Sequence, residues 1–233
     1  MNIGSGLTRL NKKVLLIDLD PQAHLTYSLG IMAHELKQSI YDLLKDNAPV
    51  EAVLIEKNKR LKVIPSNLNL AGAEIEFINL PGREYLLQEA LKDLRDFDYI
   101  LIDAPPSLGL LTINALVYAQ EIFIPLQTEF LALQGLSKLL ETVEVVKKRL
   151  NKNLEITGII ATRFDQRKIL NREVLEKIKN HFGNKVFKTV IRENITLAEA
   201  PSFGKDIFEY KKNSHGAQDY LNLCREILHR GKK

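Results

Sequence analysis

The sequence predicts an α/β protein with a doubly wound, mostly parallel sheet and helices on both faces. Two short apolar runs, residues 14–17 and 99–102, are typical of strands buried on both faces of a parallel sheet. Helical patterns alternate with further strand-like runs, which is the order found in βαβ units. No repeat, low-complexity tract or long linker divides the 233 residues, so we expect one domain spanning 1–233.

The elements are expected in the following order. A helix over residues 1–10 carries Ile3, Leu7 and Leu10 on one side, and Asn11-Lys12-Lys13 suits its C-terminus. The most strongly indicated helix, residues 131–150, has one apolar face and closes on Lys147-Lys148-Arg149. The expected strands are 14–17, 61–65, 99–102, 121–127, 156–162 and 186–191. The other expected helices are 39–45, 49–55, most of 68–95 with a turn at 81–82, 107–119, 171–182, 197–200 and 216–229.

The composition is that of a soluble globular protein, with 45% apolar and 27% charged residues. The single cysteine, Cys224, excludes an internal disulfide and fits a reducing cytosol. No apolar run approaches the roughly 20 residues of a membrane-spanning helix, and residues 1–13 lack the order of a secretory signal. We therefore expect a cytoplasmic protein. The net charge of +4 is a weak indication of polyanionic partners.

Acidic residues follow the two buried strands, and proline follows the acids in both places. Asp18 and Asp20 precede Pro21, and Asp103 precedes a double proline at 105–106. Ligands of open α/β sheets bind beyond the carboxyl ends of the strands, where carboxylates can hold Mg²⁺ beside nucleotide phosphates. A strand-end acid can instead cap the next helix. Two strands with the same ending favour a phosphate-and-metal site.

Several segments, in this order, resemble the ParA/Soj family of chromosome- and plasmid-partition ATPases. This family belongs to the deviant P-loop group, which also contains MinD and the nitrogenase iron protein. The resemblance covers the chain from Met1 to the last helix and implies a P-loop NTPase-like fold. Its segments are Val14-Leu-Leu-Ile-Asp-Leu-Asp-Pro-Gln22, Ile64-Pro-Ser-Asn67 with Leu70-Ala-Gly-Ala-Glu74, Asp98-Tyr-Ile-Leu-Ile-Asp-Ala-Pro-Pro-Ser107, Pro125-Leu-Gln-Thr-Glu129, and Thr189-Val-Ile-Arg-Glu-Asn194 leading into Leu197-Ala-Glu-Ala-Pro-Ser202.

The resemblance implies ATP and Mg²⁺ as cofactors and gives individual residues a role. Asp20 is similar to the catalytic acid that positions or activates the attacking water. Asp103 is similar to the switch residue linked to the metal, and Asn194 lies in the segment that borders the base. Asp18 would support the residues that contact the ligand without contacting it itself.

The resemblance also implies partners. These are a second copy of the chain in an ATP-bound dimer, non-specific DNA, and a ParB-like DNA-binding protein that triggers hydrolysis. A nucleoid-associated, cytoplasmic protein without a membrane partner is expected. The basic residues that are candidates for salt-sensitive contacts with DNA phosphates are Lys188, Arg192, Arg163 and Arg167.

The chain departs from the family pattern at its beginning. Family members start with a strand and a Lys-Gly-Gly-Val-Gly-Lys-Thr loop ahead of the helix that here starts at Met1. No Gly-x-x-x-x-Gly-Lys-Ser/Thr pattern occurs in the 233 residues, and Gly4-Ser5-Gly6 lacks the lysine. We expect a chain truncated at its N-terminus relative to the family. The absent strand is a central one by analogy, so its neighbours should carry unpaired backbone groups, and this chain should hydrolyse little or no ATP.

Three other functions remain open. The chain can be a catalytically inactive remnant that binds DNA or dimerises. It can be a MinD-like membrane-associated regulator, which would need a detachable amphipathic tail. It can also be an amidotransferase-linked ligase of the cobyrinic-acid type, which would add a glutaminase or substrate domain for which the chain has no spare length.

Overall fold

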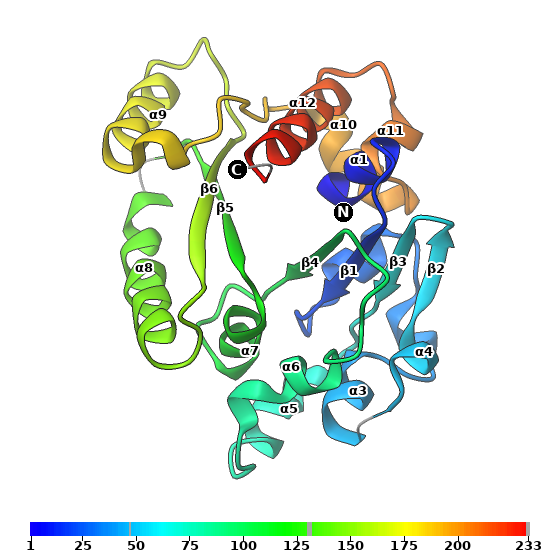
Figure 1. Cartoon of the computed structure of the whole chain (residues 1–233). Helices are drawn as coiled ribbons and strands as arrows, with labels where there is room; N and C mark the ends of the chain where they lie inside the picture. Colours follow the sequence, from blue (N-terminus) through cyan, green and yellow to red (C-terminus); the bar gives the residue numbers. More distant parts are fainter. Residues whose placement is uncertain (47, 130–131, 232–233) are drawn as a thin grey trace.

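The computed structural model describes residues 1–46, 48–129 and 132–231, and its strands are covered by helices on both sides (Figure 1). The predicted α/β class is therefore confirmed. The strands are β1 (Val14–Asp18), β2 (Ile55–Asn58), β3 (Leu61–Ile64), β4 (Tyr99–Asp103), β5 (Glu121–Gln127) and β6 (Glu155–Thr162). No helix within these described ranges is long and apolar enough to cross a membrane.

Most helices begin or end within a few residues of the predicted limits. The longer ones are α1 (Asn2–Arg9), α3 (Ile40–Asp46), α5 (Leu70–Glu76), α7 (Leu110–Tyr118), α8 (Ala132–Arg149), α9 (Ile169–Phe182) and α12 (His215–Arg230). The short ones are α2 (His24–Ser28), α4 (Val50–Val53), α6 (Leu86–Ala90), α10 (Ile195–Glu199) and α11 (Ile207–Tyr210). Single 3-10 turns are η1 (Ala33–Glu35), η2 (Arg83–Tyr85), η3 (Gly183–Lys185) and η4 (Ala200–Phe203).

The strands form two separate sheets. The larger sheet has the order β2-β3-β1-β4, in which β1 runs parallel to both β3 and β4 and β2 is antiparallel to β3. The register places Val14 opposite Leu61 on one side and Tyr99 on the other. The smaller sheet is the parallel pair β5-β6. Five of the six strands thus take part in at least one parallel pair, and only β2 is paired solely in the antiparallel direction.

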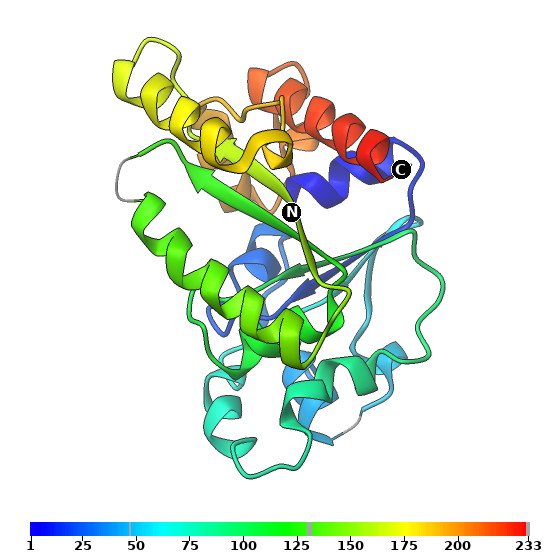
Figure 2. The same cartoon turned by 60° about the vertical axis from the view of Figure 1, so that its left-hand side comes forward.

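Strand β1 is the buried centre of the larger sheet. Leu15 and Ile17 pack on one face with residues of α3, α5, α6 and α7, whereas Val14 and Leu16 pack on the other face against α1 and α12. In Figure 2 the blue α1 and the red α12 lie on one side of the strands and the teal α5 and α6 on the other. Alternate side chains of a strand point to opposite faces, so an all-apolar strand needs both layers of helices.

Helix α7 contacts both sheets. Its residues Leu111 and Ala115 belong to the cluster that includes Ile100 of β4, while Leu116 packs in a cluster with Ile122 of β5. Strands β4 and β5 are nevertheless not paired with each other. The apolar residues 99–102 of β4 are only half-buried, although every residue of β1 is buried. The outer edges of β4 and β5 thus lack a strand partner within the described ranges.

Two predicted elements were wrong in part. Residues 186–191 do not form a strand. Val186 makes an isolated bridge with Ile159 of β6, and Arg192, just after the segment, makes one with Phe164. The carboxylate of Glu226 on α12 accepts the backbone N–H groups of Lys188 and Thr189, at 2.8 and 2.9 Å, so a side chain replaces a strand ladder there. The predicted helix 49–55 ends at Val53, and an unpredicted strand, β2, begins at Ile55.

Candidate functional site

Three acidic residues meet at the carboxyl edge of the larger sheet. Asp18 and Asp103 are Cα partners at the ends of β1 and β4. The chain stays beside β4 for one residue more, since the N–H of Leu19 donates to the carbonyl oxygen of Asp103 at 2.8 Å. Asp20 follows directly. The edge therefore carries three carboxyl groups from two strands, at the position where open α/β sheets bind ligands.

Asp18 is fully buried and hydrogen-bonded. Its Oδ2 accepts from the backbone N–H and the hydroxyl of Thr26, at 2.8 and 2.7 Å, and its Oδ1 accepts from the N–H of Asp20 at 3.2 Å. Burial raises the pKa of Asp18, with repulsion from Asp103 acting in the same direction and the bonds from Thr26 opposing it. A carboxylate with this many partners holds the turn in place rather than meeting a substrate.

Thr26 connects this acid to the neighbouring strand. Its hydroxyl donates to Asp18 and accepts from the backbone N–H of Ser66, just after β3, at 2.9 Å. Both Thr26 and Ser66 are fully buried. We did not predict these two residues from the sequence, because hydroxyl residues in a polar turn have no pattern that distinguishes them from surface residues.

Asp20 begins a tight turn into α2. Its Oδ1 accepts from the N–H of Gln22 at 2.9 Å, and its carbonyl oxygen accepts from the N–H of Ala23 at 2.9 Å. Ala23 has a φ of 55°, in the left-handed region that alanine rarely adopts. Non-glycine residues in this region are enriched at functional sites, where the surrounding structure holds them.

Asp103 lies at the unpaired edge of β4 and is exposed. The surrounding chain still withdraws its carboxyl group from bulk water enough to raise the pKa of Asp103. The positive charge at Met1 opposes this effect, Asp20 adds to it, and His24 opposes it. Met1 and α2 thus lie within electrostatic range of the same edge.

The acids fit one side of a Mg²⁺-phosphate site. Within the described ranges no group of three or more His, Cys, Asp or Glu side chains forms a metal cage. Mg²⁺ is usually held by one or two carboxylates together with waters and substrate phosphates, and Asp20 and Asp103 can supply that share. The glycine-rich loop with a lysine that would hold the phosphates is not found in the sequence, so we derive no phosphoryl-transfer step.

Asn194 is the N-cap of α10. Its Oδ1 accepts from the N–H and the hydroxyl of Thr196, at 2.9 and 2.7 Å. The segment that follows lies against α2 through a close approach of Gly30 and Gly204, both with positive φ. A Cβ atom at Gly204 would lie 2.7 Å from the Cα of Gly30, so a side chain does not fit at this position. Asn194 therefore lies on a segment that packs beside α2, the helix that follows Asp20.

Two of the candidate DNA-binding residues lie in the exposed turn after β6. Arg163 forms an ion pair with Glu193 at 3.4 Å, and Lys168, which the sequence did not single out, contacts the same carboxylate at 3.0 Å. Arg167 pairs with Asp165 at 3.0 Å, and its side chain is 90% exposed. The turn thus presents three cations whose acidic partners lie beside them.

The other two candidate DNA-binding residues, Arg192 and Lys188, have different surroundings. Arg192 holds Asp219 of α12 by Nη2 and Nε, at 2.6 and 3.0 Å, and the Asp219 side chain is only 8% exposed. This contact fastens α12 to the segment before α10, so Arg192 has a structural role that the sequence did not indicate. Lys188 is exposed on the segment whose backbone Glu226 holds.

The chain is similar to one protein family and to several known proteins. The family model described as "AAA domain" matches residues 1–156. The sporulation initiation inhibitor protein Soj of Bacillus subtilis is 46% identical over 233 residues, which are 99% of this chain and 92% of Soj. The chromosome partitioning protein ParA of Caulobacter vibrioides is 42% identical over 234 residues, covering 99% of this chain and 88% of ParA.

A solved structure with bound nucleotide has the same fold. Cobyrinic acid a,c-diamide synthase from Mycobacterium smegmatis, solved with a bound ATP analog and magnesium, superposes with a TM-score of 0.87 at 34% identity. The superposition covers 100% of this chain and 88% of the synthase chain. Because the two chains are of similar length, length alone does not separate a ligase of this type from a partition protein, contrary to the reasoning from sequence.

Proposed function

The chain belongs to the ParA/Soj family of chromosome-partitioning ATPases. We propose that it has the part of a partition ATPase that binds ATP with Mg²⁺ and non-specific DNA as a homodimer, with little or no ATP turnover by the 233 residues themselves. The observation that carries the proposal is the in-register pair Asp18 and Asp103, with Asp20 two residues further on. Acids at the carboxyl edge of a P-loop NTPase-like sheet are suited to hold Mg²⁺ and to orient water.

Each acid has a separate part in the proposal. Asp20 would orient the attacking water, and its place at the start of a tight turn fixes the backbone that carries it. Asp103 would hold Mg²⁺ directly or through water, and its exposure leaves it accessible to a ligand. Asp18 keeps the turn in place through Thr26. Asn194 borders the base from the segment beside α2.

The nucleotide part of the proposal is tested with a fused chain. A strand and a Lys-Gly-Gly-Val-Gly-Lys-Thr loop are joined ahead of Met1, and ATP binding and hydrolysis are measured with and without Mg²⁺. We expect turnover in the fused chain and little in the 233-residue chain. Asp20→Asn should lower turnover by about 10²-fold or more while ATP binding persists.

Asp103→Asn should weaken the dependence of ATP turnover on Mg²⁺. The control is Asp96→Asn, because Asp96 is an exposed acid just before β4. A folded fused chain that binds no ATP, or whose turnover is the same in Asp20→Asn, would contradict the proposal.

The DNA part is tested separately by fluorescence anisotropy with a duplex of arbitrary sequence. Affinity should fall steeply as salt increases, because counterions are released when phosphates are neutralised. Arg163→Gln, Arg167→Gln and Lys188→Gln should each weaken binding similarly on all sequences. Binding that does not respond to salt or to these changes would exclude this surface.

A second candidate function has one observation in its favour. The Mycobacterium smegmatis protein that superposes with a TM-score of 0.87 is a cobyrinic acid a,c-diamide synthase. Assaying the fused chain for ATP-dependent amidation of cobyrinic acid separates the candidates. The partition ATPase should give no product, and DNA should not affect a ligase.

A further inference from the structure

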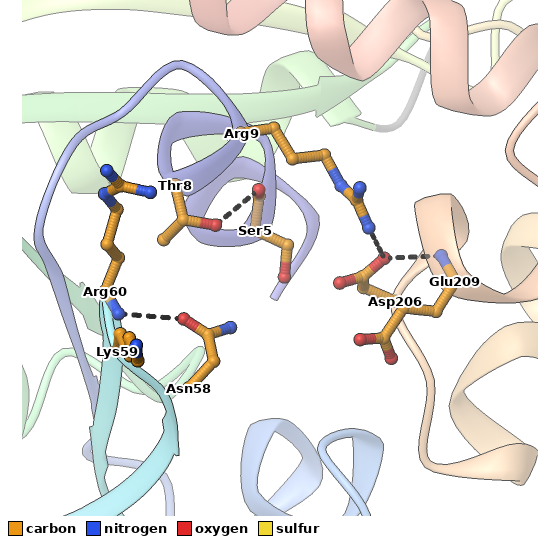
Figure 3. Close-up of a pocket in the computed structure, with 8 residues that line it drawn as sticks. All are labelled: Ser5, Thr8, Arg9, Asn58, Lys59, Arg60, Asp206 and Glu209. Atoms are coloured by element: carbon orange, nitrogen blue, oxygen red, sulfur yellow. Dashed lines mark hydrogen bonds and ion pairs between the residues drawn. The ribbon is translucent and has the colours of Figure 1, made fainter.

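A hollow of about 280 Å³ opens between α1, the β2–β3 turn and the start of α11 (Figure 3). None of the residues proposed above for nucleotide, metal or DNA lines this hollow. Small-molecule sites commonly measure about 300–1,000 Å³, so this hollow lies just below that range and suits only a small ligand.

Ser5 of α1 forms part of the floor. Its side chain is nearly fully buried, at 3% exposure, and its hydroxyl has no hydrogen-bond partner within the described ranges. Figure 3 shows this hydroxyl pointing into the space between Asn58 and Asp206. Buried hydroxyl groups are normally paired, because an unmet one costs free energy. The hydroxyl therefore indicates a partner that the chain does not supply.

The charges of the lining are divided between two walls. Arg9 is held by Asp206 at 3.8 Å and by the ring of Phe208 at 4.9 Å, so these opposite charges largely offset each other. Lys59 and Arg60, in the β2–β3 turn, are exposed and form no ion pair with any residue in the described part of the chain. Glu209 lies on the α11 side. One wall is cationic and the opposite wall can accept hydrogen bonds.

We propose that this hollow binds a small phosphorylated sugar. Lys59 and Arg60 would hold the phosphate, for which the planar guanidinium of arginine gives two parallel hydrogen bonds. Glu209 would accept hydrogen bonds from sugar hydroxyls on the opposite side. The Ser5 hydroxyl has almost no accessible surface, so it would gain its missing partner when the floor of the hollow opens slightly around the ligand. A ligand with an anion at one end and hydroxyl groups at the other matches both walls.

Ribose 5-phosphate is the probe for the test, with the 233-residue chain studied by calorimetry and by ¹H–¹⁵N NMR. We expect saturable binding, with shifted resonances confined to residues 5–9, 58–60 and 206–209. Ribose without phosphate should bind at least about tenfold more weakly, since hydrogen bonds to charged groups are the stronger ones. A short DNA duplex tests whether the phosphate must belong to a free sugar.

Two changes distinguish ligand binding from a structural role. The double variant Lys59→Gln/Arg60→Gln should weaken binding at least about tenfold without changing the melting temperature. Ser5→Ala should weaken binding but raise the melting temperature of the free protein, because it removes the unpaired hydroxyl. Lys177→Gln on α9, also exposed, should change neither. The proposal is overturned if ribose 5-phosphate does not bind, or if the resonances that it shifts belong to residues elsewhere in the chain. It is also overturned if the Lys59→Gln/Arg60→Gln and Ser5→Ala variants bind ribose 5-phosphate normally, or if only the DNA duplex, and not the sugar phosphate, shifts the resonances of the hollow.

Discussion

Asp18 and Asp103 are Cα partners at the carboxyl ends of β1 and β4, so the fold holds two carboxyl groups on adjacent parallel strands. The pKa of each is raised, mainly because the protein withdraws it from water, and a third acid, Asp20, raises that of Asp103 further. The isolated chain would be more stable with fewer charges at this edge. Such concentrated, perturbed acids are typical of functional sites.

Replacing Asp103 by asparagine should therefore stabilise the chain at neutral pH. A raised native pKa means that the folded state binds the proton more tightly than the unfolded state. Its stabilising contribution is complete below the unfolded pKa of about 3.9 and is lost as the pH rises through the native pKa. We expect Asp103→Asn to melt at a slightly higher temperature at pH 7, with only a small gain because water partly screens the exposed carboxyl group, and the difference should shrink as the pH falls toward about 4. Thermal unfolding of both chains across this range is the measurement, and a lower melting temperature at pH 7 would contradict it.

Removing the hydroxyl of Thr26 should destabilise the chain strongly. Thr26→Val keeps the shape but leaves Asp18 with one bond fewer and the buried N–H of Ser66 without its partner. The expected loss in the free energy of unfolding is about 2–4 kcal/mol. Thr26→Ser is the matched control, since it keeps the hydroxyl and loses only a methyl group, at about 1 kcal/mol. Urea unfolding measures both, and equal losses would mean that the hydroxyl does not matter.

The sequence predicted well those parts of the fold whose local apolar pattern is enough to identify the element. The runs that became β1 and β4 are apolar in every position, and the acids directly after them had to end at the same sheet edge. Strand β2 was missed because its residues, Ile-Glu-Lys-Asn, are mostly exposed and polar. It is held at the sheet edge by antiparallel pairing with β3, which a local pattern does not reveal.

Other features depended on contacts between distant parts of the chain. The apolar segment at 186–191 has the composition of a strand, yet Glu226 satisfies two of its backbone N–H groups. Likewise, Arg192 was grouped with the DNA-binding candidates because the sequence does not reveal its contact with Asp219, 27 residues later. Side chains that take the place of backbone partners cannot be found from periodicity.

The difference between Arg192 and Arg167 gives a direct test of their roles. Arg192→Gln should lower the free energy of unfolding by about 2–4 kcal/mol, because it leaves the buried Asp219 carboxylate without its charge partner. Arg167→Gln should change it by less than about 0.5 kcal/mol, since its side chain is 90% exposed. Urea unfolding compares them. Equal stabilities would mean that the bond between Arg192 and Asp219 contributes little to the fold.

Glu193 should oppose the proposed binding of DNA. Its carboxylate accepts from Lys168 at 3.0 Å and from Arg163 at 3.4 Å, and these contacts lower the pKa of Glu193, so it is ionised at neutral pH. Glu193→Gln would remove the negative charge that both exposed cations share. Affinity for a duplex should then rise about 3–10-fold at low salt. The slope of log affinity against log salt concentration should become steeper by up to about one unit, which corresponds to one more released ion.

Stability should hardly change, because exposed ion pairs contribute only about 0–1 kcal/mol. Any loss of an acidic charge strengthens attraction to DNA over a distance, so the matched control is Glu176→Gln on α9, an exposed acid without an ion pair in the described ranges. The gain in Glu193→Gln must exceed that of the control at the same salt concentration. Equal gains would show that overall charge, and not the turn after β6, governs the interaction.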